Sequence, residues 1–338
     1  MGEADMAGKG LRRMGWIVLA IVLLAGAAAL ALNYSIGQNG PKVLDTVDRL
    51  TGGSRGVELV HSEKLGENPK QKIAVYRTAG ADSDGAAKPV FLFIHGGGWR
   101  SGDIDDYGFL ARGLAPEGYV VVLAGYRLGP DGVFPAMLED SAKAVAWTKT
   151  NIAQYGGNPD EIFISGHSAG AYNVAMIGLD QQWLGREGLK TSDIAGIIGI
   201  SGPYDFYPFD AESTKLAFGG AGDPLTTQPV NFARADAPPI LLAQGEVDTV
   251  VKPRNTAALA KAITEKGGKV QTDLFADMDH NAPILALASP WRSDRRFIDV
   301  ITGFTKKVLA GRAKLVADGP TVTDRGGQAS VQVKAGSR

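Results

Sequence analysis

The chain has 338 residues, a formal net charge of −1 and no cysteine. This length accommodates one large domain with extensions at both ends. A nearly neutral chain creates no general attraction for nucleic acid, so we expect no nucleic-acid binding. The absence of cysteine excludes disulfides, thiolate metal sites and a cysteine nucleophile. The chain contains only four histidines, His61, His95, His167 and His280, too few for a metal site built from several histidines.

The N-terminal segment, residues 1–32, contains an uninterrupted apolar run over residues 16–32. Seventeen helical residues reach about 25 Å, near the lower limit for crossing a bilayer. Three cations precede the run, Lys9, Arg12 and Arg13, and such a flank favours a cytoplasmic N-terminus and an exported body. Residues 29–31 (Ala-Leu-Ala) also resemble a signal-peptide cleavage site. We therefore predict an exported protein. It is either anchored in the membrane by this segment and facing outside the cytoplasm, or periplasmic or secreted after cleavage.

The body of the chain, residues 56–312, alternates short apolar runs with longer helical patterns. The runs cover residues 73–76, 90–94, 120–123, 162–165, 195–200, 240–244 and 270–275. They are rich in Val, Ile, Leu and Phe with little polar alternation, as expected for strands that helices cover on both faces. The helical patterns cover residues 107–115, 135–155, 169–179, 253–266 and 296–310. This order predicts an α/β domain with a mostly parallel sheet.

Three further segments lack a clear strand or helix period. Residues 33–55 are predicted to form a linker with one short helix. Residues 201–238 are rich in Gly, Pro, Asp and aromatics, and we expect a small cap over the carboxyl edge of the sheet, where such folds bind ligands. Residues 313–338 are predicted to be a disordered tail.

The pentapeptide Gly166-His167-Ser168-Ala169-Gly170 lies between an apolar run and a helical pattern. This G-x-S-x-G motif needs that context, because a sharp strand-to-helix turn exposes the serine at the top of the sheet. The two glycines leave room for the turn, and the following helix directs its free N–H groups at the reacting atoms. The motif alone is common by chance, but its position predicts Ser168 as a nucleophile.

The tripeptide Gly96-Gly97-Gly98 lies between His95 and Trp99, after the apolar run at residues 90–94. Without Cβ atoms, its backbone N–H groups can turn toward a ligand. A tetrahedral intermediate carries an oxyanion that needs such donors, each worth roughly 3 kcal/mol. A flexible turn is the alternative, but a serine motif some seventy residues later favours an oxyanion hole. His95 and His167 are expected to bond backbone around this loop and the serine turn.

A serine nucleophile needs a base, and the base needs an acid that holds its tautomer. Where a serine lies on such a strand-to-helix turn, the chain order of the three groups is serine, acid, histidine. His280 is the only histidine after Ser168, so it is the predicted base. Asp248 follows the apolar run at residues 240–244 and is the favoured acid. Three other carboxylates are less favoured: Glu246, nearer the strand end, and Asp277 and Asp279, too close along the chain to His280.

The combined motifs resemble the esterase/lipase group of α/β-hydrolases that includes hormone-sensitive-lipase-like bacterial carboxylesterases. The resemblance covers roughly residues 70–310 and depends on residues 95–99 (HGGGW), 126–128 (YRL), 134–135 (FP), 156–170 (GGNPDEIFISGHSAG) and 238–248 (PPILLAQGEVD). It implies an α/β-hydrolase fold, to which the segments described above add a small cap and a preceding N-terminal hydrophobic helix. It also implies that Gly97, Gly98 and Ala169 donate to the oxyanion. Gly125 and Gln244 depart from the group, which usually carries asparagine and histidine there.

The resemblance and the motifs together predict a serine carboxylesterase that hydrolyses short-chain acyl esters through an acyl-enzyme. Its partner would be a small-molecule ester, with no metal or organic cofactor and an oligomeric state that the sequence does not specify. One alternative is an arylformamidase-like or peptidase-like amide hydrolase on the same fold. Another is a catalytically silent, membrane-tethered binding protein.

Overall fold

The computed structural model describes residues 14, 16–23, 26, 30, 39–80 and 85–318. In this part of the chain, eight strands form one sheet in the order β1-β2-β4-β3-β5-β6-β7-β8. The strands are β1 (Val57–Lys64), β2 (Lys72–Thr78), β3 (Lys88–Ile94), β4 (Val120–Ala124), β5 (Gly157–His167), β6 (Gly196–Ile200), β7 (Ile240–Gly245) and β8 (Val270–Phe275). β1 pairs antiparallel with β2, and β2 with β4; the remaining pairs are parallel.

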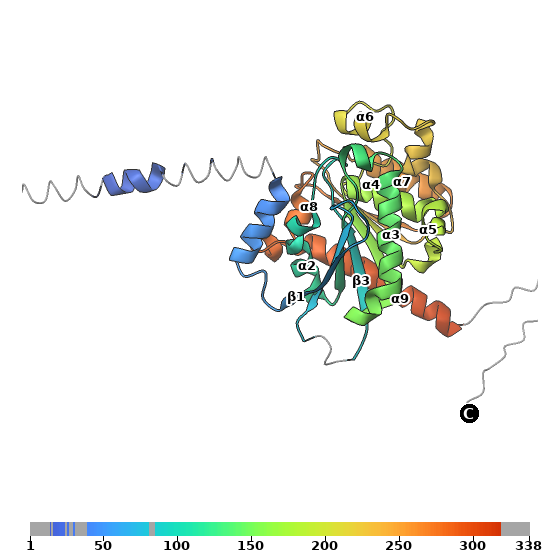
Figure 1. Ribbon diagram of the computed structural model, residues 1–338, viewed down its shortest axis with the longest axis horizontal. Coiled ribbons are helices and arrows are strands. Elements are labelled where there is room, and N and C mark those ends of the chain that lie inside the picture. The colour runs from blue at the N-terminus through green and yellow to red at the C-terminus, as the bar shows by residue number, and fades with distance from the viewer. Residues whose placement is uncertain are drawn as a thin grey trace, which may run out of the picture.

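Helices cover both faces of the sheet (Figure 1). On one face lie α3 (Ala136–Asn151), α4 (Ala169–Leu179), α5 (Gln181–Arg186) and α7 (Arg254–Glu265). The other face is covered by α2 (Gly108–Leu114), α8 (Ala282–Leu285) and α9 (Arg296–Asp318). Alternate residues of one strand reach opposite faces, so Leu92 packs into the first core and Phe91 into the second. Helices therefore cover both faces of a mostly parallel sheet, which confirms the predicted α/β fold.

The strand β1 was not among the predicted strands. It is an edge strand whose residues are half-buried or exposed, and its sequence, VELVHSEK, lacks the continuous apolar run of the central strands. Its pairing with β2 depends on the neighbouring strand rather than on its own composition. Edge strands of this kind carry a weaker hydrophobic signal because only part of their surface is covered.

Residues 201–238, predicted as a cap, contain α6 (Glu212–Phe218) and the short 3-10 helices η7 (Pro224–Thr227) and η8 (Pro229–Phe232). An aromatic cluster holds this segment to the body: the ring of Phe218 contacts those of Trp99 and Tyr172 at centroid distances of 4.8 and 5.1 Å. Phe206 stacks on the same group. The segment lies at one end of the molecule (Figure 1).

The predicted linker, residues 33–55, contains a helix over residues 39–50 that is docked on the body. Arg112 of α2 donates to the carboxylates of Asp45 and Asp48, and all three side chains are buried. Asp48 also accepts from Arg292 (3.0 Å) and from the backbone N–H of Ser289 (2.7 Å). A buried carboxylate with this many partners is well compensated, so the helix is firmly attached.

The two ends of the chain bear on the remaining predictions. At the C-terminal end, α9 continues to Asp318, so residues 313–318 of the predicted tail are helical, and residues 319–338 lie outside the described residues. Most of the predicted N-terminal segment, residues 1–32, also lies outside them. Among the described residues, no helix has the length and apolarity needed to span a membrane.

Candidate active site

Ser168 lies on a sharp turn between β5 and α4, with φ 54° and ψ −119°. The turn packs so closely that neither flanking glycine has room for a side chain. A Cβ on Gly166 would lie 2.3 Å from the carbonyl of Gly170, and one on Gly170 would lie 2.0 Å from the carbonyl oxygen of Ile94. Both glycines are therefore required for the turn and for its contact with the end of β3. This is the strained strand-to-helix turn that the motif predicts.

The glycine run after β3 lies directly against this turn. A Cβ on Gly96 would be 3.2 Å from the Cβ of Ser168. Gly97 and Gly98 have φ values of +116° and +59°, a backbone region that favours glycine. Gly97, Gly98 and Ala169 line the same cavity as Ser168. The three predicted oxyanion donors are thus gathered around the serine.

Trp99 anchors the end of the glycine run. Its side chain is buried, and its indole N–H donates to Asn173 Oδ1 of α4 at 3.2 Å. Asn173 in turn donates to Ser141 Oγ of α3 at 3.1 Å. This chain of hydrogen bonds ties the glycine loop to two helices, so the loop is held in place before any ligand binds.

His280 and Asp248 come together on the loops that follow β8 and β7. Nδ1 of His280 lies 2.8 Å from Oδ2 of Asp248, and both side chains are buried. Oδ1 of Asp248 accepts from the backbone N–H groups of Val250 and Val251, each at 2.9 Å. These donors hold the carboxylate in place, and it orients the imidazole so that Nε2 remains available.

The three less favoured carboxylates have other surroundings than the ring of His280. Glu246 is exposed on the loop after β7. Asp277 forms an ion pair with Arg296 (2.7 Å), which lowers the pKa of the Asp277 carboxyl. Asp279 accepts from the N–H groups of residues 281 and 282 at the start of α8. Asp248 is therefore the carboxylate that reaches His280.

Gln244, noted in the sequence only as a departure from the group, proves to support the acid. Its Nε2 donates to Oδ2 of Asp248 (2.8 Å) and to the carbonyl of Val251 (2.7 Å). Its Oε1 accepts from the hydroxyl of Thr256 at 2.8 Å. The side chain is fully buried, and both of its polar atoms form hydrogen bonds. The signal for this role was its position at the carboxyl end of a buried strand, four residues before the acid.

We expect Gln244→Leu to lower kcat/KM for a short ester about tenfold, equivalent to about 1.4 kcal/mol of transition-state stabilisation. The change removes a donor to Asp248 and frees the loop that carries the carboxylate. Gln271→Leu on β8 is the matched control, because that amide bonds Asp273 away from the cavity. Steady-state kinetics and thermal melting measure both variants. Equal activity of the Gln244→Leu variant and the wild type would contradict the role.

The two remaining histidines of the site bond backbone carbonyls, as expected. Nε2 of His167 donates to the carbonyl of His280 (2.8 Å), and Nδ1 of His95 donates to that of Gly96 (2.7 Å). Burial lowers the pKa of His167 to about 3, helped by the nearby charge of His280, and burial also lowers the pKa of His95 to about 4. Both rings therefore stay neutral near pH 7. They hold the base loop and the glycine loop in position.

Ser168 and His280 open into a cavity of about 480 Å³ at the carboxyl edge of the sheet. The cap contributes Phe206, Asp210, Ala211, Ser213 and Thr214 to its wall. The exposed Lys252, on the loop before α7, and the exposed Arg254, the first residue of α7, also line it. Pro41 of the docked helix also lines it. Within the described residues, no group of three or more His, Asp or Glu side chains is placed to hold a metal ion.

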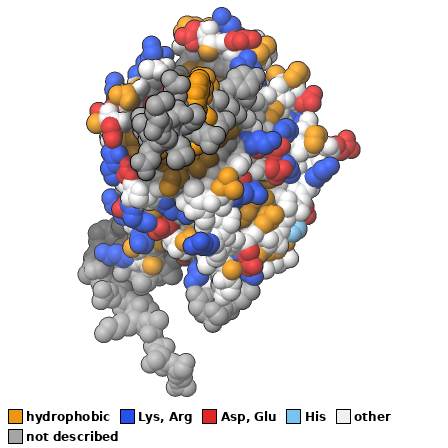
Figure 2. Space-filling view, turned by 90° about the vertical axis from the view of Figure 1, so that its left-hand side faces the viewer, with side chains coloured by type: hydrophobic (Ala, Val, Ile, Leu, Met, Phe, Trp, Pro, Cys, Tyr) orange, Lys and Arg blue, Asp and Glu red, His pale blue; other side chains and the backbone are white. Residues whose placement is uncertain are grey.

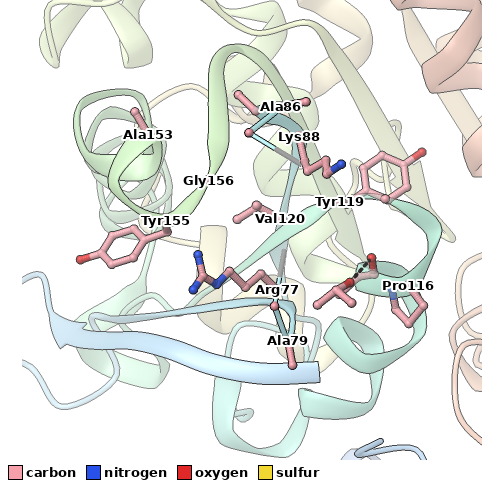
Figure 3. A pocket seen from close by; sticks show the side chains of 16 residues that line it. Arg77, Ala79, Ala86, Lys88, Pro116, Tyr119, Val120, Ala153, Tyr155 and Gly156 are labelled. Carbon is pink, nitrogen blue, oxygen red and sulfur yellow. Dashed lines mark hydrogen bonds between the residues drawn. The ribbon is translucent and has the colours of Figure 1, made fainter. Parts of the chain in front are cut away.

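A second cavity, of about 460 Å³, lies at the amino ends of β3 and β4 (Figure 3). The side chains of Arg77, Lys88, Tyr119 and Tyr155 line it, and none of the predicted site residues does. Ligands of open α/β sheets bind at the opposite edge, so this cavity is not the candidate site.

A mostly parallel sheet with a serine on its central strand-to-helix turn, and an acid and a histidine on later loops, defines the α/β-hydrolase fold. Residues 78–263, more than half of the chain, match the family model described as BD-FAE. The chain belongs to this family.

Two solved structures agree in fold. Esterase B from Lactobacillus rhamnosis has a TM-score of 0.68 at 19% identity, covering 87% of this chain and 99% of that one. The hyperthermophilic esterase of Pyrobaculum calidifontis has a TM-score of 0.63 at 18% identity, covering 82% and 94%.

Similar sequences carry the names of esterases. Esterase LipC of Mycobacterium tuberculosis is 30% identical over 225 residues, 59% of this chain and 54% of LipC. The isoprenylcysteine alpha-carbonyl methylesterase ICME of Arabidopsis thaliana is 26% identical over 289 residues, 75% of this chain and 66% of that protein. This chain thus spans between about half and two thirds of the length of these relatives. The resemblance to esterases and lipases of the α/β-hydrolase type is confirmed.

Proposed function

We propose that this chain is a serine carboxylesterase in which Ser168 is the nucleophile, His280 the base and Asp248 the acid. The observation that carries the proposal is the 2.8 Å contact between His280 and Asp248 beside the cavity that Ser168 lines. The esterase names of the similar proteins support ester bonds as the substrate.

In the proposed reaction, Oγ of Ser168 attacks the ester carbonyl carbon while its proton passes to Nε2 of His280. The carbonyl oxygen becomes an oxyanion, which the N–H groups of Gly97, Gly98 and Ala169 stabilise. The C–O bond then breaks, and the alcohol leaves with the proton from His280. Water next gives a proton to His280 and attacks the acyl-enzyme, releasing the carboxylic acid and restoring Ser168. Asp248 stabilises the imidazolium in both steps.

The acyl group proposed for this enzyme is short. On the cap side of Ser168, the cavity wall includes Phe206, Asp210, Ala211, Ser213 and Thr214. Phe206 is itself packed against Trp99 and Phe218, and these contacts hold this wall of the cavity in position. A short acyl chain fits against it without moving the aromatic cluster.

Ester and amide hydrolysis are separated by one comparison. We expect the purified chain to hydrolyse p-nitrophenyl acetate with a kcat/KM at least about a hundredfold above that for N-formylkynurenine, a difference of about 2.7 kcal/mol in transition-state stabilisation. The release of nitrophenol and the loss of the formyl amide are followed by absorbance under the same conditions. A preference for the formyl amide would replace the esterase proposal by the arylformamidase alternative.

We also propose that the protein is exported and that its N-terminal segment binds a membrane. The apolar run at residues 16–32 with its basic flank supports this. In the described part of that run, large apolar side chains are exposed, Trp16 at 70% and Leu23 at 64%. Retention of the full chain in carbonate-washed membranes tests the proposal, and full release by carbonate would contradict it.

A further inference from the structure

An apolar groove runs between the docked helix at residues 39–50 and α8. Its volume is about 470 Å³. Its lining consists of Gly40, Pro41, Val43, Leu44, Val47, Asp279, Asn281, Ala282, Ile284, Leu285 and Trp291. Pro41, Asn281 and Ile284 also line the catalytic cavity, so the two spaces adjoin along a shared wall.

The helix wall of the groove is apolar and only half covered by the protein itself. Val47 lies four residues after Val43 and three after Leu44, so the three side chains lie toward one face of the helix, and each is half-buried. Trp291, 41% exposed, also lines the groove. The one carboxylate of the lining, Asp279, is already bonded to the start of α8. Concave apolar surface of this kind favours an apolar ligand.

The groove exists before any ligand binds. The buried contacts of Asp48 with Arg112 and Arg292 hold the helix at a set position against the body. Breaking such a network is costly, because it leaves a buried charge without a partner. Figure 2 views the molecule from the side that carries this helix and shows hydrophobic side chains at the surface among charged ones. A preformed groove binds a flexible chain without the cost of ordering its own walls.

The position of the base decides which half of an ester faces the groove. His280 must deliver its proton to the oxygen of the leaving alcohol, so the alcohol lies on the His280 side of Ser168. The groove is lined by Asp279 and Asn281, the residues on either side of His280 in the chain, and by residues of α8. The acyl group is directed instead to the cap side of the cavity, where Phe206, Asp210, Ala211, Ser213 and Thr214 contribute to the wall.

We infer that the groove binds the alcohol portion of the substrate, and that the substrates are esters of a short acid with an extended apolar alcohol. This inference rests on the proposed esterase function and assigns the two halves of its substrate to different walls. A chain of methylene groups leaving the site past Ile284 would contact Leu44, Val47 and Leu285 in turn.

The test is a series of acetate esters from ethyl to octyl acetate, assayed with the full-length chain in non-ionic detergent. Acetic acid release is followed by proton production, so that the alcohol needs no chromophore. We expect kcat/KM to rise about twofold to fourfold per added methylene, fourfold being the effect of complete burial at about 0.8 kcal/mol. A second series, of p-nitrophenyl esters from acetate to octanoate, varies the acyl chain instead.

Two substitutions of one groove residue, Val47, test whether this groove binds the alcohol chain. Val47→Phe fills the groove while keeping it apolar, and Val47→Glu places a charge in it; glutamate is at least as good a helix former as valine. Both are expected to reduce the ratio of octyl to ethyl acetate kcat/KM at least about tenfold, or about 1.4 kcal/mol. Leu50→Glu is the matched control, because Leu50 is 81% exposed on the same helix and lies outside the groove. It should leave the ratio within about twofold, the range of ordinary surface substitutions.

The outcomes separate this inference from the proposed function. A wild type that hydrolyses ethyl acetate with a flat alcohol series overturns the inference and leaves the esterase function intact. That outcome would assign the groove to another occupant, such as a segment of this chain or a second copy. A steep acyl series that Val47→Phe flattens also overturns it, because the groove would then bind the acid half. If no ester is hydrolysed by the wild type, the proposed function itself fails, and the inference fails with it.

Discussion

Ser168→Ala is expected to lower kcat for p-nitrophenyl acetate by at least about 10⁴-fold, since loss of the nucleophile of a serine hydrolase leaves only binding and oxyanion stabilisation. The fold should survive the change. Both residues carry a Cβ, so the strain of the positive φ at this turn is the same, and the bond from the backbone N–H of residue 168 to the carbonyl of Ile200 is kept.

A fluorophosphonate probe provides the second measurement, because it labels an activated serine directly. The wild type should be labelled and Ser168→Ala should not. Ser201→Ala is the matched control: Ser201 also ends a strand, also has a positive φ, and is fully buried outside the cavity. That variant should keep labelling and activity within about threefold, as substitutions away from the reacting atoms usually do. Labelling that persists at another serine of the Ser168→Ala variant would disprove the assignment.

Asp248→Asn is expected to lower kcat/KM by at least about a hundredfold, and the comparable change in a serine protease costs about 10⁴ in kcat. Four donors converge on the Asp248 carboxylate: Gln244 Nε2, His280 Nδ1, and the N–H groups of Val250 and Val251. An asparagine amide group must face donors in either orientation. The NH₂ group of the asparagine would therefore repel one pair of these donors, or it would force His280 into the tautomer that cannot accept the proton of Ser168.

Three other acids serve as controls for that result. Asp277→Asn, Asp279→Asn and Glu246→Gln should each lower kcat/KM less than about tenfold, or about 1.4 kcal/mol, because none of them reaches His280. The four variants are compared on one short ester, with thermal melting to verify folding. A sensitive Glu246 or Asp277 beside a nearly normal Asp248 would show that His280 has a different partner. Ser168 and His280 would then keep their roles.

Several elements of the site could be predicted because their signals are local. The turn at Ser168 is encoded by an apolar strand, two glycines and a helical pattern within about twenty residues. His280 was identified because it is the only histidine after Ser168. Asp248 was favoured by its place after a buried strand, and the structure brings its carboxylate to His280 while Glu246 and Asp277 lie elsewhere.

The α/β fold class, the serine turn and the candidate acid and base can be predicted from the amino-acid sequence, because buried strands and tight turns depend on neighbouring residues. Only the tertiary structure revealed the docked helix at residues 39–50, because its attachment joins Asp48 to Arg112, 64 positions away. The hydrogen bond from Gln244 to Asp248 likewise depends on how the loop after β7 folds back over its strand. The groove beside His280 lies between segments more than two hundred residues apart in the chain. Contacts between such distant segments arise from the packing of the whole domain, and no local pattern encodes them.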